Sequence, residues 1–260
     1  MLTPDTIRLL ARRLYDARKS RTQLRHFSMQ HQGITIEDGY AIQSEWVRME
    51  LADGRSIKGR KIGLTSRAMQ QASQITEPDY APLMDDMFFD SGSDIPYERF
   101  IAPRVEVELA FVLAKPLKGP GIGLIDVLRA TEYVVPSLEL IDARMVDPRK
   151  IYDTISDNGA AAGIVLGGRP VGPAEVDLRW VGAALYKNGE IEETGLASGV
   201  MGHPAMGIAW LANKVGPLGI TLAPGHMMLA GSFTRPVWVE AGDTVQADFG
   251  PLGNVAVQFV

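Results

Sequence analysis

The sequence predicts an α+β protein in which a helical N-terminal region precedes a β-sandwich or barrel-like core. Apolar residues recur at helical spacing through roughly the first fifty residues, whereas the rest of the chain consists mostly of short β-like runs punctuated by glycine and proline. The alternating strand–helix–strand units of a doubly wound sheet are missing from this pattern. We place a boundary after residue 75, which gives a mainly helical region 1–75 and a β-rich domain 76–260 within one compact unit.

The composition indicates a cytoplasmic globular protein that binds neither nucleic acid nor membranes. Of the 260 residues, 46% are hydrophobic and 22% charged, and the net charge is −5 without any basic stripe. There is no cysteine, so disulfides and thiolate metal sites are excluded. The N-terminus lacks the layout of a signal peptide, and no apolar run approaches the roughly 20 residues of a membrane span.

Two helices are expected in the N-terminal region. Thr3 and Pro4 form a typical helix start, and apolar residues follow at helical spacing to residue 17. A second helix is expected to begin at Thr35, where Thr35 and Asp38 match a capping box, and to end at Gly54.

The chain then changes to short strands. Residues 57–64 read as a strand in which Lys61 stands between two glycines, where the backbone can approach a ligand closely. A short helix is expected at 65–74, followed by a stiff loop at 77–82 because of its two prolines. Asn188-Gly189 is a strong hairpin signal. Other strands are expected at 104–113, 133–141, 160–166, 178–186, 191–194, 227–231, 237–240, 244–249 and 255–260, with helices at 125–130 and 203–214.

The strand at 104–113 presents an electrostatic problem. Its alternation puts Glu106 and Glu108 on the same face, roughly 7 Å apart at Cα. Two unit charges about 6 Å apart repel by about 3 kcal/mol at an effective dielectric of about 20. A positive group should therefore offset the repulsion, and either Arg104 or a bound metal ion could be that group.

Glu139 is a third carboxylate in an apolar strand, where it needs a cation or good hydrogen-bond donors. One interpretation pairs it with Arg144; the other joins it to Glu106 and Glu108 in a site of oxygen ligands, which suits Mg²⁺ or Mn²⁺. The histidines at 26, 31, 203 and 226 show no metal-binding spacing.

Two further residues are candidates for acid–base chemistry. Lys61 could be a cationic or proton-transferring group, although a surface lysine would fit the same pattern. Asp79 could transfer a proton, although an ordinary turn aspartate is an equally simple interpretation.

These features, taken in order, resemble the hydratase/decarboxylase family of aromatic meta-cleavage pathways, within the fumarylacetoacetate hydrolase superfamily. The resemblance covers nearly the whole chain. The motifs that carry it are Gly-Arg-Lys-Ile-Gly-Leu-Thr-Ser at 59–66, Glu-Pro-Asp-Tyr at 77–80, Arg-Val-Glu-Val-Glu-Leu-Ala at 104–110, Leu-Glu-Leu-Ile-Asp-Ala-Arg at 138–144, Ser-Asp-Asn at 156–158, Gly-His-Pro at 202–204 and Gly-Ser-Phe-Thr-Arg-Pro at 231–236.

The resemblance implies a mixed β-sandwich roll like the C-terminal part of fumarylacetoacetate hydrolase, and a homo-oligomer, expected to be a decamer. It also implies hydration of a small 2-oxo dicarboxylate, as in homoprotocatechuate (4-hydroxyphenylacetate) degradation. The implied residues are Glu106, Glu108 and Glu139 for Mg²⁺ or Mn²⁺, and Lys61 and Asp79 for substrate handling and proton transfer. To these we add Ser232 and Arg235 as candidates for binding the substrate.

Arg235 is the candidate for recognising the second carboxylate of a seven-carbon diacid, although it could instead bridge subunits or a strand edge. A decarboxylase, a hydratase of the five-carbon monoacid, a carbon–carbon hydrolase and a non-catalytic metal-stabilised protein are the alternatives. No histidine lies near the strand at 104–113, which counts against the hydrolase.

Overall fold

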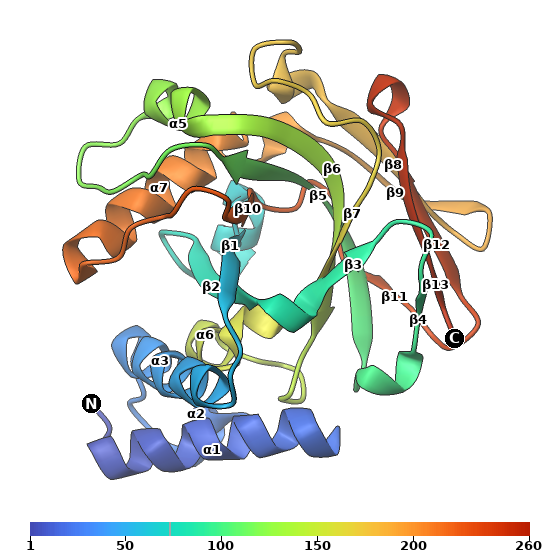
Figure 1. Cartoon of the computed structure of the whole chain (residues 1–260). Coiled ribbons are helices and arrows are strands. Elements are labelled where there is room, and N and C mark those ends of the chain that lie inside the picture. The colour runs from blue at the N-terminus through green and yellow to red at the C-terminus, as the bar shows by residue number, and fades with distance from the viewer. Residues whose placement is uncertain (73) are drawn as a thin grey trace.

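The computed structural model describes residues 1–72 and 74–260 and confirms the predicted α+β architecture. N-terminal helices lie along one end of a strongly curved set of strands (Figure 1). The helices are α1 (Pro4–Ser20), α2 (Phe27–Gln30), α3 (Ile36–Ala52), α4 (Arg67–Ala72), α5 (Leu124–Ala130), α6 (Ile151–Ser156) and α7 (Ala205–Val215). The strands are β1 (Ile57–Gly63), β2 (Asp79–Met84), β3 (Phe88–Asp90), β4 (Asp94–Ile95), β5 (Pro103–Leu113), β6 (Thr131–Asp142), β7 (Ala161–Leu166), β8 (Gly182–Lys187), β9 (Glu190–Leu196), β10 (Met227–Leu229), β11 (Val237–Trp238), β12 (Thr244–Asp248) and β13 (Asn254–Phe259).

The strands form two sheets. The larger has the order β2-β1-β10-β5-β6-β7-β3, with β11 pairing with β5, and the smaller has the order β4-β13-β12-β8-β9. One apolar cluster joins the sheets, because it contains Val105 and Val107 of β5 together with Val255 and Val257 of β13. The alternate residues of β5 are thereby free to carry polar groups on the other face.

The N-terminal helices cover that other face of the larger sheet. Their starts are as predicted: Thr3 Oγ1 accepts a hydrogen bond from the Thr6 N–H, and Thr35 and Asp38 form a capping box. Leu14 and Trp46 belong to a second apolar cluster, to which the strands β2, β6 and β10 also contribute. The boundary after residue 75 stays a prediction, although β1 from its N-terminal side is an inner strand of the sheet.

The prediction for the segment after α4 was wrong. Residues 77–82 were expected to form a stiff loop, but β2 begins at Asp79 and pairs with β1. Pro82 is tolerated there because β2 ends the strand order and its other side needs no ladder partner. The expected helical end at Gln74 lies beyond Ser73, which is outside the described residues. The pairing of β2 with β1 sets Asp79 opposite Gly63.

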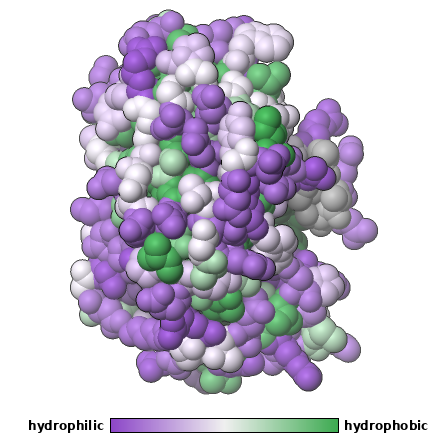
Figure 2. Space-filling view, turned by 90° about the vertical axis from the view of Figure 1, so that its right-hand side faces the viewer, coloured by the Kyte–Doolittle hydropathy of each residue, from purple (hydrophilic) through white to green (hydrophobic). Residues whose placement is uncertain are grey.

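The smaller sheet forms one side of the molecule. Its β8–β9 hairpin turns at Asn188 and Gly189, with φ of 52° and 87°, as their sequence predicts. Hydrophobic residues on this side are scattered among hydrophilic ones (Figure 2). Throughout the described part of the chain, every helix is too short or too polar to cross a membrane.

Candidate active site

Three glutamates meet where β5 pairs with β6. Glu106 lies directly opposite Glu139, and Glu108 follows two residues later on the same face of β5. One carboxylate oxygen from each residue lies within 4.8 Å of the other two. Glu108 and Glu139 are each 1% exposed. The structure therefore brings the three predicted metal ligands together in a cluster in which Glu108 and Glu139 are buried and Glu106 is half-buried.

The charges of this cluster are not balanced by the protein alone. Burial, followed by the charge of Glu139, raises the pKa of Glu106 to about 7, and burial raises the pKa of Glu108 well above its usual value. Glu139 Oε1 is buried and receives no well-directed hydrogen bond from the residues described. Buried carboxylates with unused lone pairs fit a divalent cation with oxygen ligands.

Lys61 extends from β1 to this cluster, and its Nζ lies 3.2 Å from Glu139 Oε1. The side chain is 6% exposed, so the interpretation of Lys61 as a surface lysine was wrong. Burial alone would lower the pKa of its ammonium group, but the charges of Glu139 and Asp79 raise it above the usual value. Arg144 is not the partner of Glu139 either, because its Nε donates to Asp157 Oδ1 at 2.6 Å.

Asp79 is held beside Lys61 by the pairing of β2 with β1. It is 2% exposed, so it is not an ordinary turn aspartate. Burial raises the pKa of Asp79, and the charge of Lys61 and the Gly63 N–H oppose that rise. A carboxyl group that keeps its proton to higher pH is suited to general acid–base catalysis.

Two glycines make room for these side chains. A Cβ at Gly63 would overlap Asp79 Oδ1, and a Cβ at Gly159 would lie 2.7 Å from Lys61 Cε. Gly159 stands between Asn158 and Ala160, and all three have positive φ. This consecutive left-handed stretch is strained for the two non-glycine residues. We did not identify Gly159 from the sequence; the Asn158-Gly159 pair was the available signal, because both residue types favour positive φ.

The segment 231–236, which holds the predicted substrate residues, contacts the glutamate cluster at Glu108. The Gly231 N–H donates to Glu108 Oε2 at 2.8 Å. Ser232 Oγ donates to the carbonyl oxygen of Thr234 at 2.9 Å, so this hydroxyl helps to shape the segment. Arg235 is ion-paired with Glu193 at 2.6 Å, and its side chain is 81% exposed. The structure thus places Arg235 at the rim of the site rather than inside it.

Two cavities meet at Glu106. One, of about 540 Å³, is lined by Lys61, Asp79 and Glu106 among others. The other, of about 430 Å³, is lined by all three glutamates and by Ser232 and Arg235. Both volumes fall in the range of small-molecule sites, about 300–1,000 Å³.

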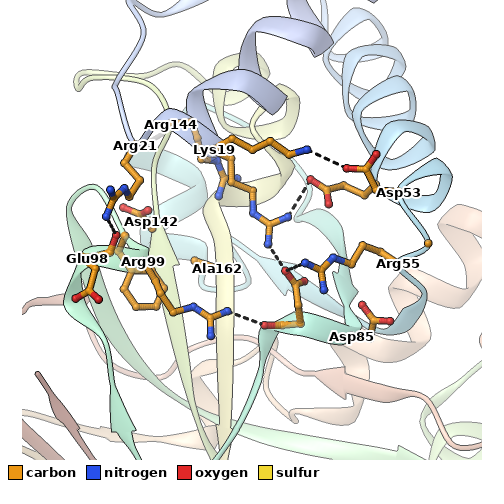
Figure 3. A pocket seen from close by; sticks show the side chains of 15 residues that line it. Lys19, Arg21, Asp53, Arg55, Asp85, Glu98, Arg99, Asp142, Arg144 and Ala162 are labelled. Carbon is orange, nitrogen blue, oxygen red and sulfur yellow. Dashed lines mark hydrogen bonds and ion pairs between the residues drawn. The ribbon is translucent and has the colours of Figure 1, made fainter.

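A third cavity, of about 750 Å³, lies among charged residues between the N-terminal helices and the strands (Figure 3). Its charges already pair with one another. Arg18 contacts Glu50 and Asp86 at 2.9 and 2.7 Å, and Lys19 contacts Asp53 at 3.0 Å. These ion pairs favour a structural role for this cavity over a binding role.

A family model described as fumarylacetoacetate (FAA) hydrolase C-terminal matches residues 59–260, and the chain belongs to this family. The chain is 58% identical to 2-oxo-hept-4-ene-1,7-dioate hydratase of Escherichia coli, with 100% of both chains covered. It is 38% identical to 2-hydroxyhexa-2,4-dienoate hydratase of Comamonas testosteroni, with 95% of each covered. The structure of 4-oxalocrotonate decarboxylase from Pseudomonas putida G7, complexed with magnesium and adipate, matches with a TM-score of 0.97 at 32% identity, covering 100% of this chain and 99% of that one.

Proposed function

We propose that the protein is a divalent-metal-dependent hydratase acting on 2-oxohept-4-ene-1,7-dioate, which reaches the enzyme as its 2-hydroxydienoate tautomer. Water would add at C4 to give 4-hydroxy-2-oxoheptanedioate. The observation that carries the proposal is the convergence of three glutamates, two of them buried and Glu106 half-buried, with Lys61 and Asp79 at one cavity junction. The 58% identity to a hydratase of this substrate supports the assignment of substrate and reaction.

Glu106, Glu108 and Glu139 would hold the metal, which we propose to be Mg²⁺ or Mn²⁺. When bound, the ion supplies Lewis acidity that stabilises negative charge on the 2-oxo oxygen of the substrate. Glu108 and Glu139 are buried, and the low effective dielectric around them strengthens their electrostatic interactions.

Lys61 and Asp79 would provide charge stabilisation and proton transfer. The Lys61 ammonium would stabilise the enolate oxygen, because its raised pKa keeps it charged. Asp79, whose pKa is also raised, would transfer the proton lost by the 2-hydroxyl group to C5 of the dienol. It would then orient the water whose oxygen adds to C4 while its proton goes to C3. Protonation at C5 gives a conjugated ketone, which makes C4 electrophilic. Ser232 and Arg235 stay predictions for substrate contact from the second cavity.

Substrate comparison tests this proposal. We expect kcat/KM for the seven-carbon dienol diacid to exceed that for the five-carbon monoacid 2-hydroxypenta-2,4-dienoate by at least about ten-fold, because only the diacid offers a second charged contact. We expect no carbon dioxide release from 4-oxalocrotonate. Equal use of both dienols, or release of carbon dioxide as the faster reaction, would assign the chain to one of the alternative activities.

Binding of Mg²⁺ should tighten as the pH rises through about 7. The pKa of Glu106 is about 7 in the folded metal-free protein and about 4.5 in its ordinary state. Between about pH 4.5 and 7 the folded metal-free protein binds a proton at Glu106 that the unfolded protein has lost, so its stability falls as the pH rises through this range. Mg²⁺ must displace this proton in order to bind. The rise in Tm on adding Mg²⁺ should therefore be larger at about pH 8 than at about pH 6. An equal rise at both pH values would show that Glu106 is not a ligand with this pKa.

Gly63→Ala should lower kcat by about 10- to 100-fold, because the added Cβ would displace the Asp79 carboxyl group that it overlaps. Gly123→Ala is the matched control, since Gly123 has φ of −114° and its nearest neighbour would lie 3.7 Å away. Steady-state kinetics with Mg²⁺ present would measure the change. If Gly63→Ala keeps the wild-type kcat, Asp79 takes no part in the reaction.

The proposal also covers the oligomeric state and the pathway. We propose a homo-oligomer, with the decamer as the state to test by light scattering, and a place in homoprotocatechuate degradation. The preceding step would have to supply a 2-hydroxydienoate diacid, and the following step would have to consume a 4-hydroxy-2-oxo acid.

A further inference from the structure

A buried arginine with an unused donor lines the same cavity as Lys61 and Asp79. Arg149 lies in the loop after β6, its side chain is 10% exposed, and its Nε donates to Asp147 Oδ1 at 2.9 Å. Its Nη1 is buried and finds no hydrogen-bond partner in the part of the chain that the structure describes. An unsatisfied donor on a buried guanidinium is costly, so it indicates a missing acceptor.

Arg104 also lines this cavity and also has a buried donor without an acceptor. Its Cζ lies over the Trp238 ring, 4.6 Å from the centroid, which is a cation–π contact. Its Nε is buried and has no acceptor among residues 1–72 and 74–260. Arg104 and Arg149 line the same cavity, so two guanidinium groups of like charge face one space.

The nearby carboxylates are already engaged. Asp142 accepts hydrogen bonds from the Ile101 and Ala102 N–H groups at 2.9 and 2.7 Å. Asp147 is bound to Arg149 Nε and is 53% exposed, so it offsets the charge weakly. Glu106 belongs to the metal cluster. An anion from outside the chain would accept hydrogen bonds from the unused donors and balance the two positive charges that line the cavity.

We propose that Arg104 and Arg149 bind the carboxylate at the far end of a dicarboxylate whose 2-oxo acid end is held at the three glutamates. This inference rests on the proposed function and names the residues that select the diacid. Arg104, Glu106, Lys61, Asp79 and Arg149 line one cavity, so a single extended ligand can contact all of them. Guanidinium groups are suited to this role because they bind carboxylates with two parallel hydrogen bonds.

The structure favours this pair over Arg235 as the diacid anchor. Arg235 lines the second cavity, and its Nε and Nη2 already contact Glu193 Oε1 at 2.8 and 2.6 Å. Its side chain is 81% exposed, so water would screen any contact with substrate. The Arg149 side chain, by contrast, is 10% exposed, and its Nη1 has no acceptor among the residues described.

Equilibrium binding of two saturated acids in the presence of Mg²⁺ tests the inference. 2-Oxoheptanedioate and 2-oxoheptanoate share the chain and the 2-oxo acid end, and neither has a double bond to hydrate. We expect the wild-type protein to prefer the diacid by about 10- to 100-fold. Arg149→Met and Arg104→Met should each reduce that preference at least about ten-fold while leaving monoacid affinity unchanged, and Arg149→Lys should have a smaller effect. Arg169→Met is the control, because Arg169 is 56% exposed and its ion pair with Glu175 spans 3.8 Å.

The possible outcomes separate the two proposals. If the wild-type protein binds neither acid, the proposed function fails and this inference falls with it. If the wild-type protein prefers the diacid and Arg149→Met keeps the full preference, the inference alone is overturned. Equal weakening of both acids would place the arginines at the 2-oxo acid end and overturn it, as would a loss of preference confined to Arg235→Met.

Discussion

Replacement of Glu106 by glutamine is expected to lower hydration by about 10³-fold, because Lewis-acid stabilisation is worth several kcal/mol of barrier. The variant removes one of three carboxylates whose oxygens lie within 4.8 Å of one another, and an amide is a weaker ligand than a carboxylate. It also removes a like charge that lies directly opposite the buried Glu139. The metal-free variant should therefore be more stable than the metal-free wild-type protein, while its gain in Tm on adding Mg²⁺ should be lost.

Glu132→Gln is the control for this change, because Glu132 lies on β6 like Glu139 but is exposed. Calorimetric titration with Mg²⁺ and thermal unfolding with and without the ion would separate lost metal binding from lost folding. Full activity of Glu106→Gln without a metal requirement would contradict the assignment of the cluster.

Lys61→Met should lower kcat by about 10²- to 10⁴-fold, the range expected for loss of a proton-transferring or oxyanion-stabilising group. Mg²⁺ affinity should be retained or increased, because the cation 3.2 Å from Glu139 Oε1 would no longer repel the metal. The metal-free variant should lose on the order of 3 kcal/mol of stability, since a buried carboxylate loses its ion-pair partner.

Lys58→Met is the control for this second change, because Lys58 lies on the same strand β1 and is exposed. Measuring kcat and Mg²⁺ affinity on both variants distinguishes catalysis from metal loading. If Lys61→Met keeps wild-type kcat, or loses activity only through lost Mg²⁺ binding, Lys61 has no direct part in the reaction.

The features that follow from local periodicity and capping could be predicted from the sequence. The alternation in β5 placed Glu106 and Glu108 on one face, because side chains in a strand alternate regardless of what surrounds them. Thr35 and Asp38 similarly form the capping box that their spacing predicts. The motifs that carry the family resemblance also predicted the fold and the grouping of the three glutamates as metal ligands.

Long-range pairing could not be predicted in the same way. Residues 77–82 read locally as a loop because of their prolines, and only the edge position of β2 shows why Pro82 is tolerated in a strand. The contact of Lys61 with Glu139 depends on the order of four strands, β1, β10, β5 and β6. Arg149 lies in a loop without any periodic pattern, so its unused donor became visible only in the structure.

The metal requirement of the hydration reaction distinguishes a catalytic metal site from a glutamate cluster without a catalytic role. The protein would be treated with EDTA, and loss of the dienol absorbance of 2-hydroxyhepta-2,4-dienedioate would be followed before and after addition of Mg²⁺. We predict no enzymatic loss in EDTA and full recovery with Mg²⁺ in the wild-type protein, with no recovery in Glu106→Gln. Loss of the dienol at the wild-type rate in EDTA would contradict the account of the glutamate cluster as the catalytic metal site.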